Sequence, residues 1–180
     1  INIAVYHGSM SRCKTDTNWT MSFGDDEIDI FDSFDFSMLG DIHRRQFLDE
    51  AGRIWYAGST IQQNHGESND KGILIWDIKS KDDWDIEPVV FKNPKPFVTI
   101  ELTPKGKMPY KVQVPSGARL RLVSNNNLPL NVMKRAVDIA KHRFSPESIS
   151  FLNRAAGERG NVEDLTSGLQ TENLRDINLQ

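Results

Sequence analysis

The chain contains one cysteine and no long apolar segment. The single cysteine, Cys13, excludes a disulfide within the chain, and this fits a reducing compartment. No apolar run approaches the ~18 residues that a membrane-spanning helix needs, and no segment resembles a signal peptide. Internal repeats and low-complexity tracts are also absent. The sequence therefore predicts a cytoplasmic protein that does not use a membrane as a partner.

An initiator methionine is lacking as well, because the sequence opens with Ile1 and enters an apolar segment at once. We therefore expect the chain to be part of a longer protein. Its hydrophobic content of 38% allows a folded core and argues against disorder. Its 180 residues suit one large domain or two small ones.

The net charge of −3 conceals a strong asymmetry along the chain. Residues 1–90 hold 8 Lys and Arg against 17 Asp and Glu, a balance of −9, whereas residues 91–155 hold 12 against 3, a balance of +9. An acidic half next to a basic half suits a metal-dependent enzyme that acts on a polyanion. The alternative is a pair of solvated surfaces whose opposite charges help the halves to dock.

Hydrophobic periodicity predicts mostly strands, with one longer helix at 131–143 where Met133, Val137 and Ala140 share a stripe. Residues 24–35 are expected to form a short helical turn with a solvated acidic face. Strands are predicted at 2–6, 36–39, 44–48, 53–57, 72–78, 84–91, 97–102, 119–123 and 148–152, with a possible short one at 19–23. The predicted fold class is α/β to α+β.

A change of composition divides the chain. The segment Asn93-Pro94-Lys95-Pro96 predicts a linker or a sharp domain entry, because proline fixes its own φ and restricts the residue before it. We therefore expect one domain at 1–92 and a second, a strand–helix–strand module, at 93–155. The polar tail at 156–180 is interpreted as a linker.

Two predicted strands end in side chains that can bind a metal ion. His7 follows the first strand, and Asp41 and His43 follow the strand at 36–39. If these strands lie side by side, their carboxyl ends bring the three side chains to one point. Imidazole with carboxylate suits Mn²⁺, Fe²⁺ or Zn²⁺ rather than Ca²⁺. The alternative is that the histidines are structural, and three ligands are too few for two metal ions.

Four further basic residues each have an ordinary alternative to a functional role. His65 lies in a polar loop and is expected to make local hydrogen bonds, and His142 fits the negative end of a helix dipole. Arg44 and Arg45 directly follow the possible metal ligands. They could hold a phosphate or simply supply surface charge, and the sequence favours neither.

Several short motifs occur in the order and at the spacing of a known family. They are His7-Gly8, Phe36-Ser37-Met38-Leu39-Gly40-Asp41-Ile42-His43, Tyr56-Ala57-Gly58-Ser59, Gln62-Gln63-Asn64-His65-Gly66-Glu67 and Lys71-Gly72-Ile73-Leu74-Ile75-Trp76-Asp77. Together they resemble the C-terminal half of the SbcD-type DNA exonucleases, which are calcineurin-like metallophosphoesterases, and most closely the phage recombination branch. Residues 148–154 resemble the end of that family's capping domain.

The resemblance implies a partial metallophosphoesterase β-sandwich at 1–92 and an α+β DNA-capping domain at 93–155. It also implies a two-metal site loaded with Mn²⁺, or with Mg²⁺, in which His7 and Asp41 serve one metal and His43 the other. Asp41 stands where the family usually has histidine. Three further metal motifs of the family precede the counterpart of His7 and have no match in this sequence. We therefore expect the intact parent to hydrolyse DNA phosphodiesters in recombination and double-strand break repair, and this chain to be inactive alone.

The implied partners are DNA, an SMC-like ATPase of the SbcC type, which would bind beyond the tail, and a second copy of the intact parent. Arg119 and Arg121 share one strand face and are the first candidates for phosphate contacts. The other DNA-binding candidates are Lys105, Lys107, Lys134 and Arg135. Two alternatives stay open, which are a phosphatase of the same fold and a non-catalytic DNA-binding or assembly module.

Overall fold

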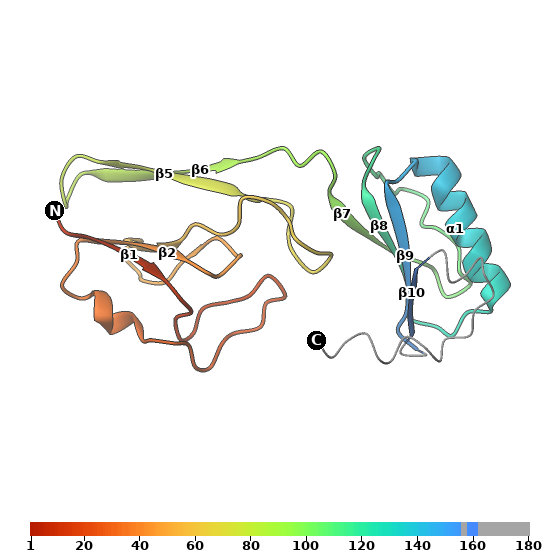
Figure 1. The fold of residues 1–180 in the computed structure, drawn as a ribbon, viewed down its shortest axis with the longest axis horizontal. Coiled ribbons are helices and arrows are strands. Elements are labelled where there is room, and N and C mark those ends of the chain that lie inside the picture. Colours follow the sequence, from red (N-terminus) through yellow and green to blue (C-terminus); the bar gives the residue numbers. More distant parts are fainter. Residues whose placement is uncertain (156–157, 162–180) are drawn as a thin grey trace. The chain divides into compact units, whose positions relative to one another are not determined.

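The computed structural model of the protein describes residues 1–155 and 158–161, which belong to two compact units. The first unit is Ile1–Asn93, and the second begins at Pro94, within the proline-containing segment. The described residues form ten strands, one α-helix and one short 3-10 helix (Figure 1). This content of mostly strands with one helix is of the α+β class. No helix in the described ranges has both the length and the apolar character of a membrane span.

The first unit is built on a four-stranded sheet. Its strands are β1 (Ile3–His7), β2 (Phe36–Gly40), β3 (Gln46–Phe47) and β4 (Ile54–Tyr56). They follow the order β1-β2-β4-β3, in which β1, β2 and β4 run parallel and β3 runs antiparallel to β4. The register pairs His7 with Gly40. The carboxyl ends of β1 and β2 therefore lie next to each other.

One face of this sheet is covered by the segment between β1 and β2, which includes the 3-10 helix η1 (Ile28–Phe31). Tyr56 is fully buried there and bridges the two layers, since its hydroxyl donates to the Gly8 carbonyl at 2.7 Å and accepts from the Met10 amide at 2.9 Å. Burial raises the pKa of the Tyr56 hydroxyl well above its usual range. These contacts hold the chain that leaves β1 against the end of β4.

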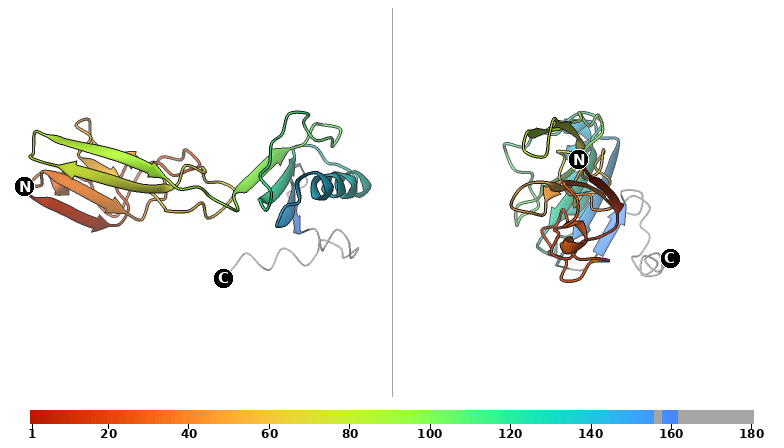
Figure 2. Two further views of the ribbon diagram at one scale, coloured as in Figure 1. Left: turned by 90° about the horizontal axis from the view of Figure 1, so that it is seen from above. Right: turned by 90° about the vertical axis from the view of Figure 1, so that its left-hand side faces the viewer.

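The opposite face carries the antiparallel hairpin β5 (Gly72–Ile78) and β6 (Trp84–Val90), as Figure 2 shows. Phe36 of β2 is 1% exposed and meets Trp76 and Trp84 edge-on, with ring centroids 6.0 and 5.5 Å away. Edge-to-face geometry of this kind is favourable for aromatic pairs. Gly72 is the first residue of the hairpin. A larger residue does not fit at this position, because a Cβ there would lie 1.9 Å from the Val89 carbonyl oxygen.

The second unit packs one helix on one face of a sheet. Its strands are β7 (Phe97–Glu101), β8 (Arg119–Ser124), β9 (Ser148–Asn153) and β10 (Glu158–Asn161), in the order β10-β9-β8-β7. The strands β7, β8 and β9 are parallel, and β10 is antiparallel to β9. The helix α1 (Leu130–Phe144) buries Val137 and Ala140 against Leu122 and Phe151 of the sheet.

Two of the predicted elements differ from the structure. Residues 19–23 form no strand and contribute only an isolated bridge between Lys14 and Thr20. The predicted linker at 156–180 contains the strand β10. Its sequence is polar, and it forms a strand because the free edge of β9 offers backbone hydrogen bonds that need no apolar pattern. The rest of that linker, 156–157 and 162–180, lies outside the described residues.

Candidate functional site

The site begins where β1 and β2 end. His7 is exposed at the last position of β1, and its ring lies against Gly40, the last residue of β2. A Cβ on Gly40 would come within 3.0 Å of His7 Cδ2. Glycine at this position therefore leaves the space that the imidazole ring occupies.

Asp41, directly after β2, has a φ of +97°. This lies in the region that favours glycine, and a strained backbone of this kind costs on the order of 1–3 kcal/mol. The next residue, Ile42, is buried in the core of the first unit and fixes the turn. The Asp41 side chain is exposed. Strained residues held by their surroundings cluster at functional sites, so this turn marks a candidate site.

His43 is oriented by a buried carboxylate. Its Nδ1 lies 3.1 Å from Oε1 of Glu67, whose side chain is 6% exposed, while the His43 side chain is 42% exposed. A carboxylate accepts hydrogen bonds, so we assign the ring proton to Nδ1. This tautomer leaves the lone pair of Nε2 available. Metal-binding histidines show the same arrangement, in which the second ring nitrogen donates to a carboxylate.

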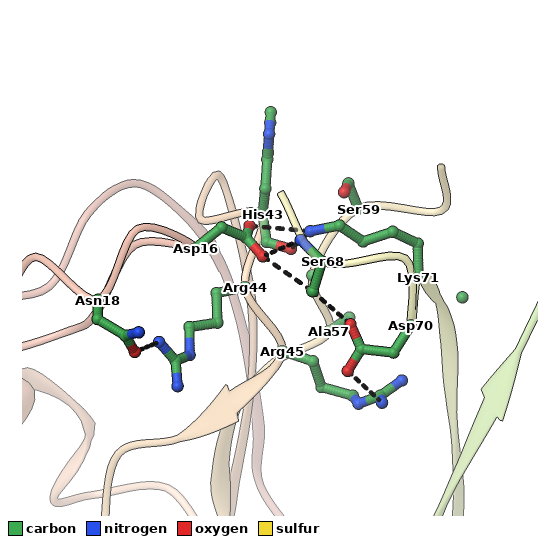
Figure 3. A pocket seen from close by; sticks show the side chains of 12 residues that line it. Asp16, Asn18, His43, Arg44, Arg45, Ala57, Ser59, Ser68, Asp70 and Lys71 are labelled. Atoms are coloured by element: carbon green, nitrogen blue, oxygen red, sulfur yellow. Dashed lines mark hydrogen bonds and ion pairs between the residues drawn. The ribbon is translucent and has the colours of Figure 1, made fainter. Parts of the chain in front are cut away.

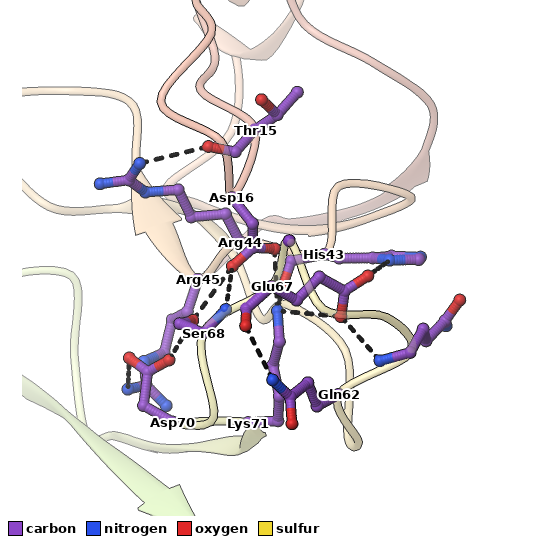
Figure 4. A network of polar contacts seen from close by, with 12 residues as sticks. Thr15, Asp16, His43, Arg44, Arg45, Gln62, Glu67, Ser68, Asp70 and Lys71 are labelled. Carbon is purple, nitrogen blue, oxygen red and sulfur yellow. Dashed lines mark hydrogen bonds and ion pairs between the residues drawn. The ribbon is translucent and has the colours of Figure 1, made fainter. Parts of the chain in front are cut away.

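Several contacts hold Glu67 in place (Figure 4). The backbone amide of Gln63 donates to Oε2 at 2.9 Å, and the side-chain amide of Asn64 donates to Oε1 at 2.9 Å. The Lys71 ammonium lies 3.6 Å from Oε2. With these partners, the carboxylate that orients His43 is itself fixed.

Lys71 is the centre of this network. Its ammonium is buried, lies 2.9 Å from Oδ2 of Asp16 and donates to the His43 carbonyl at 2.7 Å. Burial raises the pKa of Asp16, but hydrogen bonds from Lys71 and Ser68 outweigh this effect and bring the pKa below its ordinary value. One buried cation thus joins Asp16, Glu67 and the backbone of His43, which lie far apart in the sequence.

A cavity of about 310 Å³ opens beside these residues (Figure 3). Nη1 of Arg45 and Oγ of Ser59 are buried in its wall without a hydrogen-bond partner among the described residues. Nη2 of Arg45 lies 3.5 Å from Oδ2 of Asp70. The wall is formed by Asp16, Asn18, His43, Arg44, Arg45, Ala57, Gly58, Ser59, Ser68, Asp70, Lys71 and Gly72.

The three predicted metal ligands occupy the adjoining ends of β1 and β2. However, within residues 1–155 and 158–161 no three His, Cys, Asp or Glu side chains form a group that could hold a metal ion. His43 alone of the three has a buried carboxylate partner among the described contacts. The two-metal assignment of His7, Asp41 and His43 stays a prediction.

The predicted DNA-binding residues lie on three different elements of the second unit. Arg119 and Arg121 of β8 alternate with Leu120 and Leu122, which pack under α1, so both arginines lie on the sheet face away from the helix. The Arg119 guanidinium stacks 4.7 Å from the centroid of the Phe97 ring. Lys134 and Arg135 belong to α1, and Lys105 and Lys107 follow β7. Arg119 and Arg121 therefore share one sheet face, whereas the turn of Lys105 and Lys107 lies against Val132 of α1, since a Cβ on Gly106 would come within 2.3 Å of that side chain.

Four residues around His43 were not predicted from the sequence as site residues, namely Asp16, Glu67, Lys71 and Ser59. Glu67 and Lys71 are four residues apart with opposite charge, and Lys71 stands directly before an apolar strand. A lysine at the edge of such a strand is usually solvated, so this signal alone does not indicate burial. Asp16 carries no signal, because its partners lie more than fifty residues away.

No protein-family profile matches the chain. The chain is similar to a curated protein of Acanthamoeba polyphaga mimivirus, "Uncharacterized protein R555", with 34% identity over 152 residues. The matched segment covers 84% of this chain and 11% of the relative. The chain thus spans about a ninth of the length of the curated relative it matches.

Proposed function

We propose that this chain is the later part of a two-metal DNA nuclease of the SbcD type. In this proposal the first unit supplies part of the metal cleft, and the second unit supplies a DNA-contacting cap. The observation that carries the proposal is the contact between His43 Nδ1 and the buried carboxylate of Glu67. It presents Nε2 in the way that metal-binding histidines are presented.

The ligand chemistry of the strand ends is consistent with this role. His7 and His43 offer imidazole nitrogens, and Asp41 offers oxygen ligands, which together suit Mn²⁺ and also admit Mg²⁺. When bound, two such ions would activate a water and stabilise the charge of a phosphoryl transition state. The remaining ligands would come from other parts of the parent protein. On its own, the chain would orient His43 but would not complete the site.

The first test is binding of Mn²⁺ to the 180-residue chain, followed by NMR of its four histidine rings. Mn²⁺ is paramagnetic and broadens the signals of nearby nuclei. We expect the ring signals of His43 and His7 to broaden first, and that of His142, at the end of α1, to persist. Equal broadening of all four rings, or none, would contradict a metal site at the strand ends.

A cap that contacts DNA is supported by the charge of the second unit, where residues 91–155 carry 12 Lys and Arg against 3 Asp and Glu. Such contacts to phosphates depend strongly on salt. Titration of the chain with duplex DNA should therefore give affinity that falls steeply between about 50 and 200 mM salt. Variants at Arg119 and Arg121 should bind more weakly than wild type.

The same charge distribution favours a second candidate, a non-catalytic DNA-binding or assembly module. The two candidates differ in the first unit. Salt-dependent DNA binding without Mn²⁺ binding at His43 would favour the module, whereas binding of Mn²⁺ without DNA would favour a phosphatase of the same fold. The SMC-like ATPase partner and the homodimer of the parent follow from the nuclease proposal alone.

A further inference from the structure

We propose that the tip of the segment between β7 and β8 binds a single-stranded nucleic acid, with Tyr110 stacked on an unpaired base. The neighbouring phosphates are contacted by three cations, which are Lys107, Lys111 and Arg143. This inference rests on the proposed role of the second unit as a DNA-contacting cap and deepens it, because it names the form of DNA that the cap contacts. It adds a contact to those expected on the sheet face of β8.

The first argument is an exposed aromatic ring on a backbone that is held in place. Tyr110 is 90% exposed, the highest value among the exposed large hydrophobic residues of the described ranges. On either side of it, Met108 and Val112 pack against the apolar core between α1 and the sheet. The Arg143 guanidinium donates to the Tyr110 carbonyl at 3.3 Å. The ring therefore projects from an anchored backbone and can stack on a ligand without the cost of ordering a loop.

The second argument is the set of cations around this ring. Lys111 directly follows Tyr110, and Lys107 precedes it by three residues. Arg143, which lies at the Tyr110 carbonyl, also places its guanidinium 4.9 Å from the centroid of the Phe144 ring. All three cations are exposed, and none forms an ion pair within residues 1–155 and 158–161. Cations beside an exposed aromatic ring are the combination with which proteins bind single strands.

Acidic residues do not balance these cations. Residues 94–155 hold 11 Lys and Arg against three acids, which are Glu101, Asp138 and Glu147. Asp138 lies one turn from Lys134 on α1, and Glu147 pairs with Lys95. Glu101 belongs to β7 and lies on the sheet face away from α1. The surface that carries Tyr110 is therefore left positive, and this favours a polyanion as its ligand.

The aromatic ring decides which form of nucleic acid fits. In a duplex the bases stack on one another, so their faces are not accessible to a side chain. An unpaired base offers its face to an aromatic ring, and every base can do so. A strand end or a single-stranded stretch therefore fits Tyr110, and we expect little sequence preference.

The test is titration of the 180-residue chain with a labelled thymidine oligonucleotide of about 12 nucleotides, followed by fluorescence anisotropy in the presence of a chelator. A blunt duplex of the same length is the reference ligand. Tyr110→Ala should weaken binding of the oligonucleotide by about tenfold and that of the duplex by less than about twofold. Tyr110→Phe keeps the ring and should keep the affinity. Phe23→Ala is the matched control, because Phe23 is 86% exposed and belongs to the first unit.

The dependence on salt separates the ring from the cations. Each of Lys107→Gln and Lys111→Gln should reduce the slope of log affinity against log salt by about 0.7, the value for one phosphate contact on a single strand. Tyr110→Ala should lower the affinity and leave this slope unchanged, because stacking releases no counterions. Lys79→Gln is the control for the change in charge, since this lysine is exposed between β5 and β6 of the first unit.

NMR of the wild-type chain gives a result that depends on no variant. The chain has three tyrosines, and Tyr6 and Tyr56 belong to the first unit. A base stacked on Tyr110 should shift the ring signals of this residue upfield. The ring signals of Tyr6 and Tyr56 should stay where they are.

Equal affinities of Tyr110→Ala and Phe23→Ala for the oligonucleotide would overturn the proposal. A Tyr110 ring that responds only to vesicles of anionic phospholipid would overturn it as well. Duplex binding that does not involve Tyr110 would leave the DNA-contacting cap and remove this site. Single-strand binding at Tyr110 without Mn²⁺ binding at His43 would keep the site and remove the nuclease proposal.

Discussion

The second unit buries a continuous apolar layer between α1 and its sheet, whereas the first unit buries a charged network beside its sheet. The layer of the second unit contains Leu122 of β8 and Phe151 of β9, which pack against Ala140 of α1. In the first unit, Lys71 joins Asp16 and Glu67 from two polar loops. An apolar layer depends on the volume that its side chains fill, whereas a charged network depends on the pairing of its charges. The comparison predicts that charge changes damage the first unit and volume changes the second.

The largest effect is expected for Lys71→Met. It leaves the carboxylates of Asp16 and Glu67, both 6% exposed, without their shared cation. Removing one partner of a buried ion pair costs about 3–5 kcal/mol. Urea unfolding followed by tryptophan fluorescence measures this loss, because the four tryptophans lie in the first unit. Lys79→Met is the control, since that ammonium is exposed and 3.9 Å from Asp77.

A triple variant separates charge from packing. Adding Asp16→Asn and Glu67→Gln to Lys71→Met removes the two uncompensated charges while keeping the shapes of the side chains. Most of the lost stability should return, because the three residues act as one coupled group. A triple variant that is no more stable than Lys71→Met would mean that the ammonium matters for its hydrogen bond to the His43 carbonyl and not for its charge.

Leu122→Ala should destabilise the second unit by about 2–5 kcal/mol, because this side chain is fully buried between the sheet and α1. Urea unfolding followed by the helical circular dichroism signal reports this unit, which contains the only α-helix of the described residues. Ile139→Ala on the same helix is the control, since Ile139 is 45% exposed. Equal losses of stability in Leu122→Ala and Ile139→Ala would show that the apolar layer between α1 and the sheet is not the core of the second unit.

The unit with the apolar layer is also the one whose elements are closest to their sequence patterns. The helix predicted at 131–143 extends by one residue at each end, to Leu130–Phe144. In the first unit, β5 matches its prediction of 72–78. The helix has strong hydrophobic periodicity, and β5 is a continuous apolar run. Both patterns can be recognised from neighbouring residues in the sequence. The segment 19–23 pairs with its neighbour only through the isolated bridge between Lys14 and Thr20, so it forms no strand.

The site was only partly predictable. His7, Asp41 and His43 stand out in sequence because they follow strands. Their surroundings depend on polar loops that have no period, and on contacts such as Asp16 to Lys71, which are separated by 55 residues. The orientation of His43 by Glu67 is a consequence of these loops. Sequence patterns identify the strand ends, and only the folded loops identify what each side chain faces.

Glu67 should act as a positioning residue for His43. Glu67→Ala removes the acceptor of the Nδ1 proton, and loss of such a partner typically lowers metal affinity by about 10–100-fold. Glu67→Gln keeps an oxygen acceptor and should recover part of this loss. Mn²⁺ titration gives the affinities, and the ¹⁵N shifts of the His43 ring report the tautomer. A purely structural role would change stability in both variants but leave the tautomer as it is.

The smallest expected effect is a loss of stability at low pH, and it arises from the carboxyl groups of the first unit. The pKa of Asp16 lies below its ordinary value, because the hydrogen bonds from Lys71 and Ser68 outweigh the opposing effect of burial. The pKa of Asp25 is lowered by the Ser9 amide, and that of Asp70 by the hydrogen bond from Ser68. In the second unit the pKa of Glu147 is lowered by the hydrogen bond from Lys95, with which it forms an exposed pair.

A carboxyl whose pKa is lower in the folded than in the unfolded protein stabilises the fold when it is ionised. This contribution is complete above the ordinary aspartate value of 3.8 and is lost as the pH falls through the folded value. The urea midpoint of the first unit should therefore fall more steeply below about pH 4 than that of the second. Asp16→Asn should flatten the fluorescence-detected curve and leave the circular dichroism curve unchanged. Parallel acid curves for the two units would mean that the charged network does not distinguish them.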